Sequence, residues 1–235
     1  MDSIDGHPNT AIMPPRLYCD SPLRWVELSR RLVLLDLSSG TYDMVDEVGT
    51  AMWQQLLREP EQRDLPGLAD GYGVSLSSLE KDFIEFADAQ QTAGRLHPMS
   101  PSTAPPRPMA PRHRATVSRA LRERAAAQHD LRRDFAQAYR KRIGAIADES
   151  APRVDIDAAL KRFRTADGIF PAREAPLDCL PRSLALTRFL RTAGWPAVHV
   201  IGVALHPFEA HAWVELNGVA VDENASALQR YTPIA

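Results

Sequence analysis

Apolar and polar residues near the start of the chain alternate in short runs that predict a small antiparallel sheet. Three strands are expected, over Trp25–Leu28, Leu32–Asp36 and Thr41–Val45. Ser38-Ser39-Gly40 supplies turn residues between the second and third strands, because glycine tolerates a positive φ. The first part of the chain is therefore predicted to begin with a three-stranded sheet.

The hydrophobic period then changes to the spacing of helices. Asp46 is expected to cap a first helix, and a shorter second helix is expected over Leu65–Tyr72. Ser77 and Glu80 form an S-x-x-E capping box for a third helix, which ends near Gly94. Three strands followed by three helices predict a winged-helix-like α+β unit.

A proline-rich stretch follows this unit. Six prolines lie between Pro98 and Pro111, and proline removes backbone donors and fixes φ. We therefore expect a recognition domain over residues 1–96, a linker over 97–116 and a second domain over 117–235.

The formal net charge of −2 conceals a cancellation. Residues 1–96 hold 8 Lys and Arg against 16 Asp and Glu, whereas residues 97–150 hold 11 against 5. The acidic first domain argues against DNA binding by the winged-helix-like unit, because phosphate contacts require basic side chains. The interleaved apolar and basic residues of Ser118–Ala147 predict amphipathic helix with its charges on a solvated face.

Targeting signals are not visible in the sequence. The longest apolar run, Leu32–Leu35, has four residues, far below the ~20 that cross a bilayer. No secretory h-region is present near the start of the chain. Two cysteines, Cys19 and Cys179, make no disulfide framework and no zinc motif. A cytoplasmic protein without membrane or nucleic-acid partners is expected.

The candidate chemistry begins at Cys179. Asp178 is expected to cap a deeply buried helix from Cys179 to about Ala193, which Gly194 ends. A cysteine in the first turn of a helix is favoured as the thiolate by the macrodipole and the unpaired N–H groups. The alternative role for this cysteine is that of a small buried apolar side chain.

A predicted hairpin supplies a histidine and a carboxylate. Asn217-Gly218 between alternating apolar runs predicts a two-residue turn, which places Trp213 opposite Asp222. His211 then shares a face of the sheet with Asp222, whereas alternation directs Glu223 to the other face. An imidazole oriented by a carboxylate is what a cysteine nucleophile requires.

Metal binding is the less favoured reading of this segment. The candidate ligands are His206, Glu209, His211 and Glu215. His206 and His211 are five residues apart, so on a strand they point to opposite faces. Their spacing also differs from that of the helical H-E-x-x-H zinc motif. No metal is expected, and His199 and His206 are expected to be structural or exposed.

The helix and hairpin together resemble a known family. Cys179-Leu-Pro-Arg-Ser-Leu-Ala-Leu186, Ile201-Gly-Val203 and Phe208-Glu-Ala-His-Ala-Trp-Val-Glu215 resemble the lasso-peptide B proteins, leader peptidases of the transglutaminase-like cysteine protease superfamily. The resemblance implies a transglutaminase-like, papain-like domain in which Cys179 is the nucleophile, His211 the general base and acid, and Asp222 the orienting carboxylate. It implies cleavage of the amide between leader and core through a thioester.

The N-terminal unit resembles the precursor-peptide recognition element typified by the pyrroloquinoline-quinone synthesis chaperones. Leu34-Leu-Asp36, Gly40-Thr-Tyr42 and Ala51-Met-Trp53 carry this resemblance. It implies capture of a leader peptide as an added strand. The residues that would contact the peptide are Tyr42, Asp43, Met44, Phe83, Phe86 and Gln90, with a plain core role as the alternative for Phe83 and Phe86.

The resemblance also bears on cofactors and partners. It implies a precursor peptide and an asparagine-synthetase-like lasso cyclase as partners, and ATP dependence is often ascribed to the family. The sequence contains no G-x-x-x-x-G-K-[ST] motif that would bind ATP, so no cofactor is evident. A peptide-binding chaperone with an inactive protease fold, and a transglutaminase or acyltransferase that uses the same triad, are the alternative functions.

Overall fold

The computed structural model describes residues 13–19, 22–99, 107–109, 115–143, 145–147, 154–170 and 178–234. Contacts divide the chain into two compact units. The first unit comprises Met1–Leu23, Ser29–Leu32 and Met44–Thr103, and the second comprises Arg24–Leu28, Val33–Asp43 and Ala104–Ala235. The predicted functional domains 1–96 and 117–235 stay a prediction, and most of the predicted linker lies outside the described residues.

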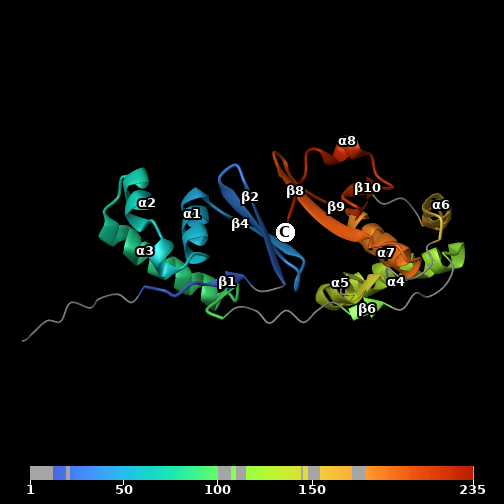
Figure 1. Ribbon diagram of the computed structural model, residues 1–235, viewed down its shortest axis with the longest axis horizontal. Coiled ribbons are helices and arrows are strands. Elements are labelled where there is room, and N and C mark those ends of the chain that lie inside the picture. The colour runs from blue at the N-terminus through green and yellow to red at the C-terminus, as the bar shows by residue number, and fades with distance from the viewer. Residues whose placement is uncertain are drawn as a thin grey trace, which may run out of the picture. The chain divides into compact units, whose positions relative to one another are not determined.

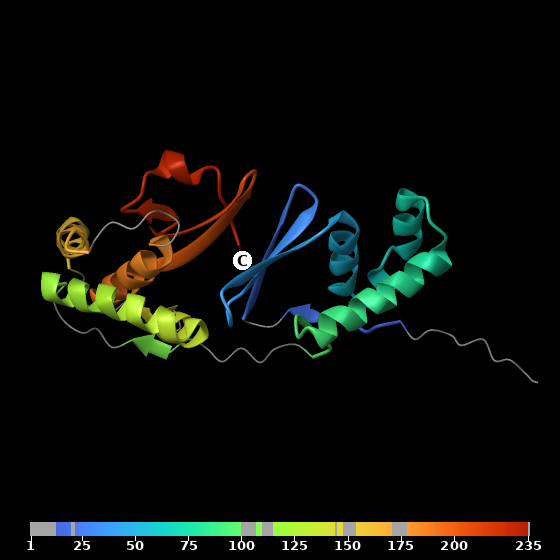
Figure 2. The ribbon, with the colours of Figure 1, turned by 180° about the vertical axis from the view of Figure 1, so that it is seen from behind.

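Helices dominate the first unit (Figure 2). They are α1 (Glu47–Leu56), a short 3₁₀ helix (Pro60–Gln62), α2 (Leu65–Tyr72) and α3 (Leu76–Thr92), and β1 (Tyr18–Cys19) pairs with β5 (Leu96–His97). Asp46 caps α1 as predicted, because its side chain accepts a hydrogen bond from the Gly49 N–H. The cap predicted at Ser77 is wrong: α3 begins earlier, and the extended Ser75 accepts a hydrogen bond from the Ser78 N–H.

The predicted N-terminal sheet is confirmed. Strands β2 (Leu23–Leu28), β3 (Arg31–Asp36) and β4 (Thr41–Val45) form an antiparallel sheet in that order, with β4 at one end. Gly40 has a φ of 76° in the turn before β4, as its place in the sequence predicted. Within the second unit, β3 residues Val33 and Leu35 are buried in one apolar cluster with Ile201 and Val203.

A second antiparallel sheet forms the centre of the second unit. Its strand order is β10 (Val219–Val221), β9 (Phe208–Leu216), β8 (Val198–Leu205) and β11 (Thr232–Pro233). Asn217 and Gly218 both have positive φ, and Val219 pairs with Leu216. The predicted hairpin and its register are therefore confirmed, because both residue types tolerate the left-handed turn.

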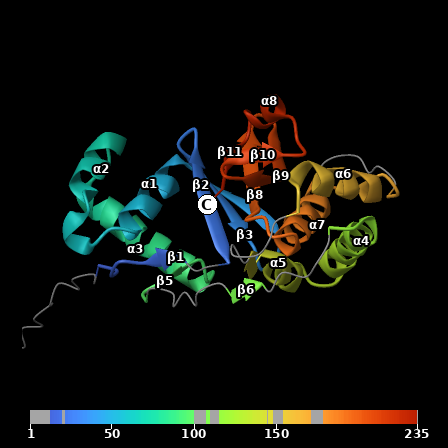
Figure 3. The same ribbon diagram turned by 45° about the vertical axis from the view of Figure 1, so that its right-hand side comes forward.

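Helix α7 (Cys179–Thr192) packs against this sheet, and further helices pack against α7 (Figure 1). They are α4 (Val117–Arg133), α5 (Phe135–Ile143) and α6 (Ile156–Asp167), and a short α8 (Ala225–Leu228) follows β10. Strands β6 (Arg107–Met109) and β7 (Ala145–Ala147) pair in parallel. Figure 3 shows α4, α6 and α7 grouped together, and Phe163 of α6 and Phe189 of α7 are fully buried in their shared core. The deep burial predicted for α7 is confirmed.

The basic helical segment differs from its predicted solvated face. The Arg124 and Arg142 side chains are each only 1% exposed. Arg142 donates to Glu123 over 3.1 Å and to Asp130 over 3.0 Å. Acidic partners from within α4 neutralise a guanidinium that the sequence pattern alone assigned to solvent. The architecture is nevertheless the mixed α+β fold that was predicted.

Candidate active site

Cys179 occupies the first position of helix α7, as the sequence predicted. Asp178 stands at the N-cap position but makes no capping hydrogen bond, so the predicted cap is wrong. Its carboxylate instead accepts hydrogen bonds from Arg124 Nη2 over 2.5 and 2.6 Å. The charge–charge interaction with a buried guanidinium outcompetes the local capping interaction, and it fixes the residue that precedes Cys179.

His211 lies on β9 next to this helix start. A side-chain hydrogen bond joins His211 to Cys179. The contacts with Cys179 and then with Glu223 raise the pKa of His211 to about 9, although burial acts in the opposite direction. The imidazole is therefore held in its protonated form at neutral pH, the form that stabilises a neighbouring thiolate.

Two aromatic rings hold the plane of this imidazole. His211 stacks on Tyr231 with ring centroids 5.3 Å apart and on Trp213 with centroids 6.2 Å apart. Trp213 donates its indole N–H to Glu215 over 2.8 Å, which fixes the indole in turn. The strand pairing thus supplies one ring from β9 itself and one from the segment before β11.

The two carboxylates after β10 share Arg182 but otherwise have different partners. The Asp222 carboxylate, 4% exposed, accepts hydrogen bonds from both Arg164 and Arg182. Glu223 Oε2 lies 3.8 Å from His211 Nε2. The carboxylate that lies beside His211 is therefore that of Glu223. The orienting role of Asp222 stays a prediction. The alternation that directed Glu223 away ends at Val221, because Asp222 has a φ of 64°.

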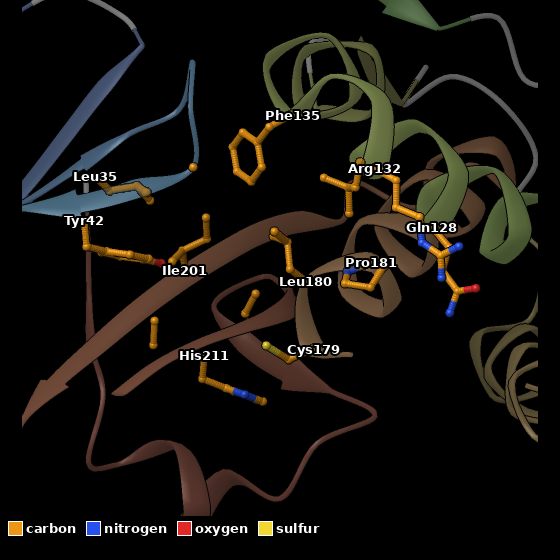
Figure 4. A pocket seen from close by; sticks show the side chains of 14 residues that line it. Leu35, Tyr42, Gln128, Arg132, Phe135, Cys179, Leu180, Pro181, Ile201 and His211 are labelled. Carbon is orange, nitrogen blue, oxygen red and sulfur yellow. The ribbon is translucent and has the colours of Figure 1, made fainter. Parts of the chain in front are cut away.

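A pocket of about 440 Å³ opens beside Cys179 and His211 (Figure 4). The residues that line it belong to β3, β4, α4, α5, α7, β8, β9 and the turn before β4. All of these lining residues lie within the second unit, and most are apolar. Tyr42 points into the pocket, packs edge-on against Phe208 with centroids 5.5 Å apart, and has its pKa raised to about 12, chiefly by burial. An apolar segment of a peptide could therefore lie against the thiol with little loss of hydration.

Comparison with known proteins assigns the fold family. The sequence profile of the transglutaminase-like superfamily matches residues 84–235, which is more than half of the chain. The chain belongs to the transglutaminase-like superfamily.

Two individual proteins are similar to this superfamily member. Microcin J25-processing protein McjB of Escherichia coli is 38% identical over 58 residues, which are 25% of this chain and 28% of McjB. The match thus spans less than a third of that relative. The structure of TbiB1 in complex with the TbiA(beta) leader peptide is 23% identical with a TM-score of 0.28, and covers 35% of this chain and 98% of TbiB1. The superfamily match and McjB confirm the resemblance to lasso-peptide B proteins.

The residues predicted to bind a leader peptide are distributed over both units of this superfamily member. Asp43 and Met44 of β4 are exposed, whereas Tyr42 points into the pocket. Phe83 has no exposed surface and therefore belongs to the core of the first unit, the alternative that the sequence left open. Phe86 is half-buried, and Gln90, 7% exposed, accepts a hydrogen bond from Arg95. Their contacts with a peptide stay a prediction.

The charged side chains that surround Arg182 were not predicted from the sequence. Arg182 lies one helical turn after Cys179 and donates to Asp167, Asp222 and Glu223. Its i+3 position relative to the nucleophile was a readable signal, whereas its partners lie 15 to 41 residues away in sequence. Within the described residues, no group of three or more His, Cys, Asp or Glu could hold a metal, and no helix is long and apolar enough to cross a membrane.

Proposed function

We propose that this protein is a leader peptidase that cleaves a lasso-type precursor peptide at the amide between leader and core. The observation that carries the proposal is the contact between Cys179, at the start of α7, and a His211 whose pKa is raised to about 9. A thiolate beside an imidazolium is a nucleophile ready for acyl transfer. The similarity to McjB, a microcin-processing protein, supports a peptide substrate.

The chemistry follows from these two side chains. The Cys179 thiolate attacks the scissile carbonyl carbon, and His211 donates its proton to the leaving amine of the core peptide. Water then attacks the thioester, His211 accepts a proton from that water, and the leader acid leaves as the Cys179 thiolate and the protonated His211 are regenerated. The backbone N–H of Cys179, in the first turn of α7, is the donor that we assign to the developing oxyanion.

Recognition of the leader is assigned to the winged-helix-like part of the chain, residues 1–96. Strand β4 stands at the end of its sheet, and Thr41, Asp43 and Met44 are exposed along it. An extended peptide that pairs with such an edge gains backbone hydrogen bonds, and side-chain pockets add selectivity. A cyclase of the asparagine-synthetase type would receive the freed core peptide, and any ATP requirement would reside there.

The decisive experiment incubates the full chain with the synthetic precursor encoded beside its gene and follows the products by mass spectrometry. We expect a leader acid and a core amine whose masses sum to that of the precursor plus one water. Cys179→Ala, the matched control, is expected to bind the precursor and to leave its mass unchanged.

Three outcomes would overturn the proposal. Binding without cleavage by the unchanged protein would indicate a peptide chaperone. Products that carry an added amine in place of water would indicate an acyltransferase. Cleavage by Cys179→Ala at the rate of the unchanged protein would exclude the cysteine mechanism.

A further inference from the structure

The strongest unassigned feature of the site is the divergence of two adjacent carboxylates. Asp222 and Glu223 follow each other directly after β10, and the positive φ of Asp222 turns the chain between them. In a continuing strand, alternation would have directed Glu223 to the face opposite Asp222 and away from His211, so the turn at Asp222 leaves Glu223 beside the histidine.

The carboxylate of Asp222 accepts hydrogen bonds from two arginines. One of its oxygens accepts from Arg164 Nε and the other from Arg182 Nη2, and only 4% of its side chain is exposed. A carboxylate that is bound on both oxygens by guanidinium groups has its charge largely compensated. This arrangement suits an anchor that connects α6 and α7 to the end of β10.

Glu223 connects Arg182 to His211. Its Oε1 accepts from Arg182 Nη1 over 3.2 Å, and its Oε2 lies 3.8 Å from His211 Nε2. Arg182 also donates Nε to Asp167 over 2.8 Å, so its guanidinium is fixed from three sides. Because Arg182 lies on the same helix as Cys179, the nucleophile and the support of its histidine share one rigid element.

We propose that Glu223, held by Arg182, is the carboxylate that orients His211 for the reaction, and that Asp222 acts as the anchor of Arg182. The inference rests on the proposed function, since it names the residues that position its catalytic histidine. Glu223 and Arg182 are positioning residues, because they act on the reacting atoms through His211. Among the described residues, the charged and titratable groups that face His211 are Cys179 from α7, Glu223 after β10 and Tyr231 before β11.

The test compares Glu223→Gln with Asp222→Asn in full-length protein that carries Cys19→Ser, so that Cys179 is its only thiol. Two readouts need no peptide substrate: the titration of His211 by NMR and the rate at which iodoacetamide alkylates Cys179 between pH 5 and pH 10. Thermal melting and circular dichroism establish that each variant is folded.

Glu223→Gln is expected to lower the pKa of His211 toward its ordinary value and to slow alkylation at neutral pH about tenfold. Asp222→Asn is expected to keep the His211 titration close to that of the unchanged protein while its melting temperature falls. Arg182→Met is expected to shift the His211 titration in the same direction as Glu223→Gln.

The reverse pattern overturns the inference. If Asp222→Asn lowers the pKa of His211 and Glu223→Gln leaves it unchanged, Asp222 is the orienting residue. The proposed function is tested separately, because the expected titrations without any cleavage of the precursor would sustain the orientation of His211 and refute the peptidase.

Discussion

Gly202 of β8 pairs with His211 of β9, and the space beside its α-carbon is filled by the ring of Trp213. A Cβ at this position would lie 2.6 Å from Trp213 Cη2 and 3.0 Å from the Cβ of Tyr231. Both rings stack on His211, so the absence of a side chain at Gly202 is what allows the aromatic enclosure of the imidazole.

We therefore expect Gly202→Ala to displace Trp213 and to lower the free energy of unfolding by about 1–3 kcal/mol, the usual cost of overpacking. Urea denaturation measures this change, and the alkylation rate of Cys179 reports the accompanying displacement of His211. The matched control is Gly168→Ala, where the nearest atom to an added Cβ is 3.5 Å away. Equal stability of the two variants would contradict the close contact.

The buried Arg124 is expected to be essential for the start of α7. It donates to Asp167 and to Asp178, the residue before Cys179, and its side chain is 1% exposed. Arg124→Met would leave partly buried carboxylates without this partner, so we expect a loss of about 3–5 kcal/mol in the free energy of unfolding.

Arg122→Met on the same helix provides the control for Arg124→Met, because Arg122 is exposed. Its effect on chemical denaturation is expected to lie within about 0.5 kcal/mol of zero. If both variants lose the same stability, the ion pairs of Arg124 contribute nothing beyond those of a surface arginine.

His199 is expected to make the protein sensitive to acid. It is 8% exposed, its Nε2 lies 2.9 Å from Ser183 Oγ, and burial lowers its pKa to about 3. Below about pH 6.5, His199 becomes protonated in the unfolded chain but stays neutral in the folded protein, whose His199 pKa is about 3. The free energy of unfolding is therefore unaffected by His199 above about pH 6.5 and decreases as the pH falls from there toward 3. Between pH 7 and pH 5 we expect the loss to be about 2 kcal/mol.

The measurement for His199 is urea denaturation at several pH values. His199→Gln keeps a side-chain amide near Ser183 without a titratable ring, so its stability is expected to depend less on pH than that of the unchanged protein. The exposed His129, replaced by Gln, serves as the control and is expected to retain the original pH dependence. An unaltered pH dependence in His199→Gln would refute the assignment.

Local sequence signals predicted the elements that carry the reacting groups. The Asn217-Gly218 turn determined the β9–β10 register, because only a two-residue left-handed turn fits those residue types between alternating strands. The apolar residues of α7 cover most of its circumference, which predicted its burial. The helix start at Cys179 was predicted from Asp178 as the preceding residue, and the start is confirmed although the capping hydrogen bond is absent. These features depend on neighbours within a few residues.

The partners and the burial of charged side chains were less predictable from the sequence than the helices and strands. Arg124 of α4 and Arg142 of α5 lie in an amphipathic segment whose charges were expected on a solvated face. Both are instead buried and paired with carboxylates, Arg142 with Glu123 of α4 and Arg124 with the distant Asp178. The ion pair with Arg124 likewise replaces the capping hydrogen bond that was predicted for Asp178 at the start of α7. Such pairs do not follow from the periodicity of the sequence, because the attraction between charges depends on their distance in space.

The sequence by itself determined a cysteine at a helix start, a histidine on the adjoining hairpin and the superfamily to which they belong, because local periodicity and turn chemistry encode those elements. Only the tertiary structure decided which carboxylate faces the histidine. A single residue in the left-handed conformation ends the alternation at Asp222, and arginines 40 and 58 residues away in sequence bind its carboxylate. Long-range charge pairing thus directs Asp222 toward the helices and leaves Glu223 beside His211.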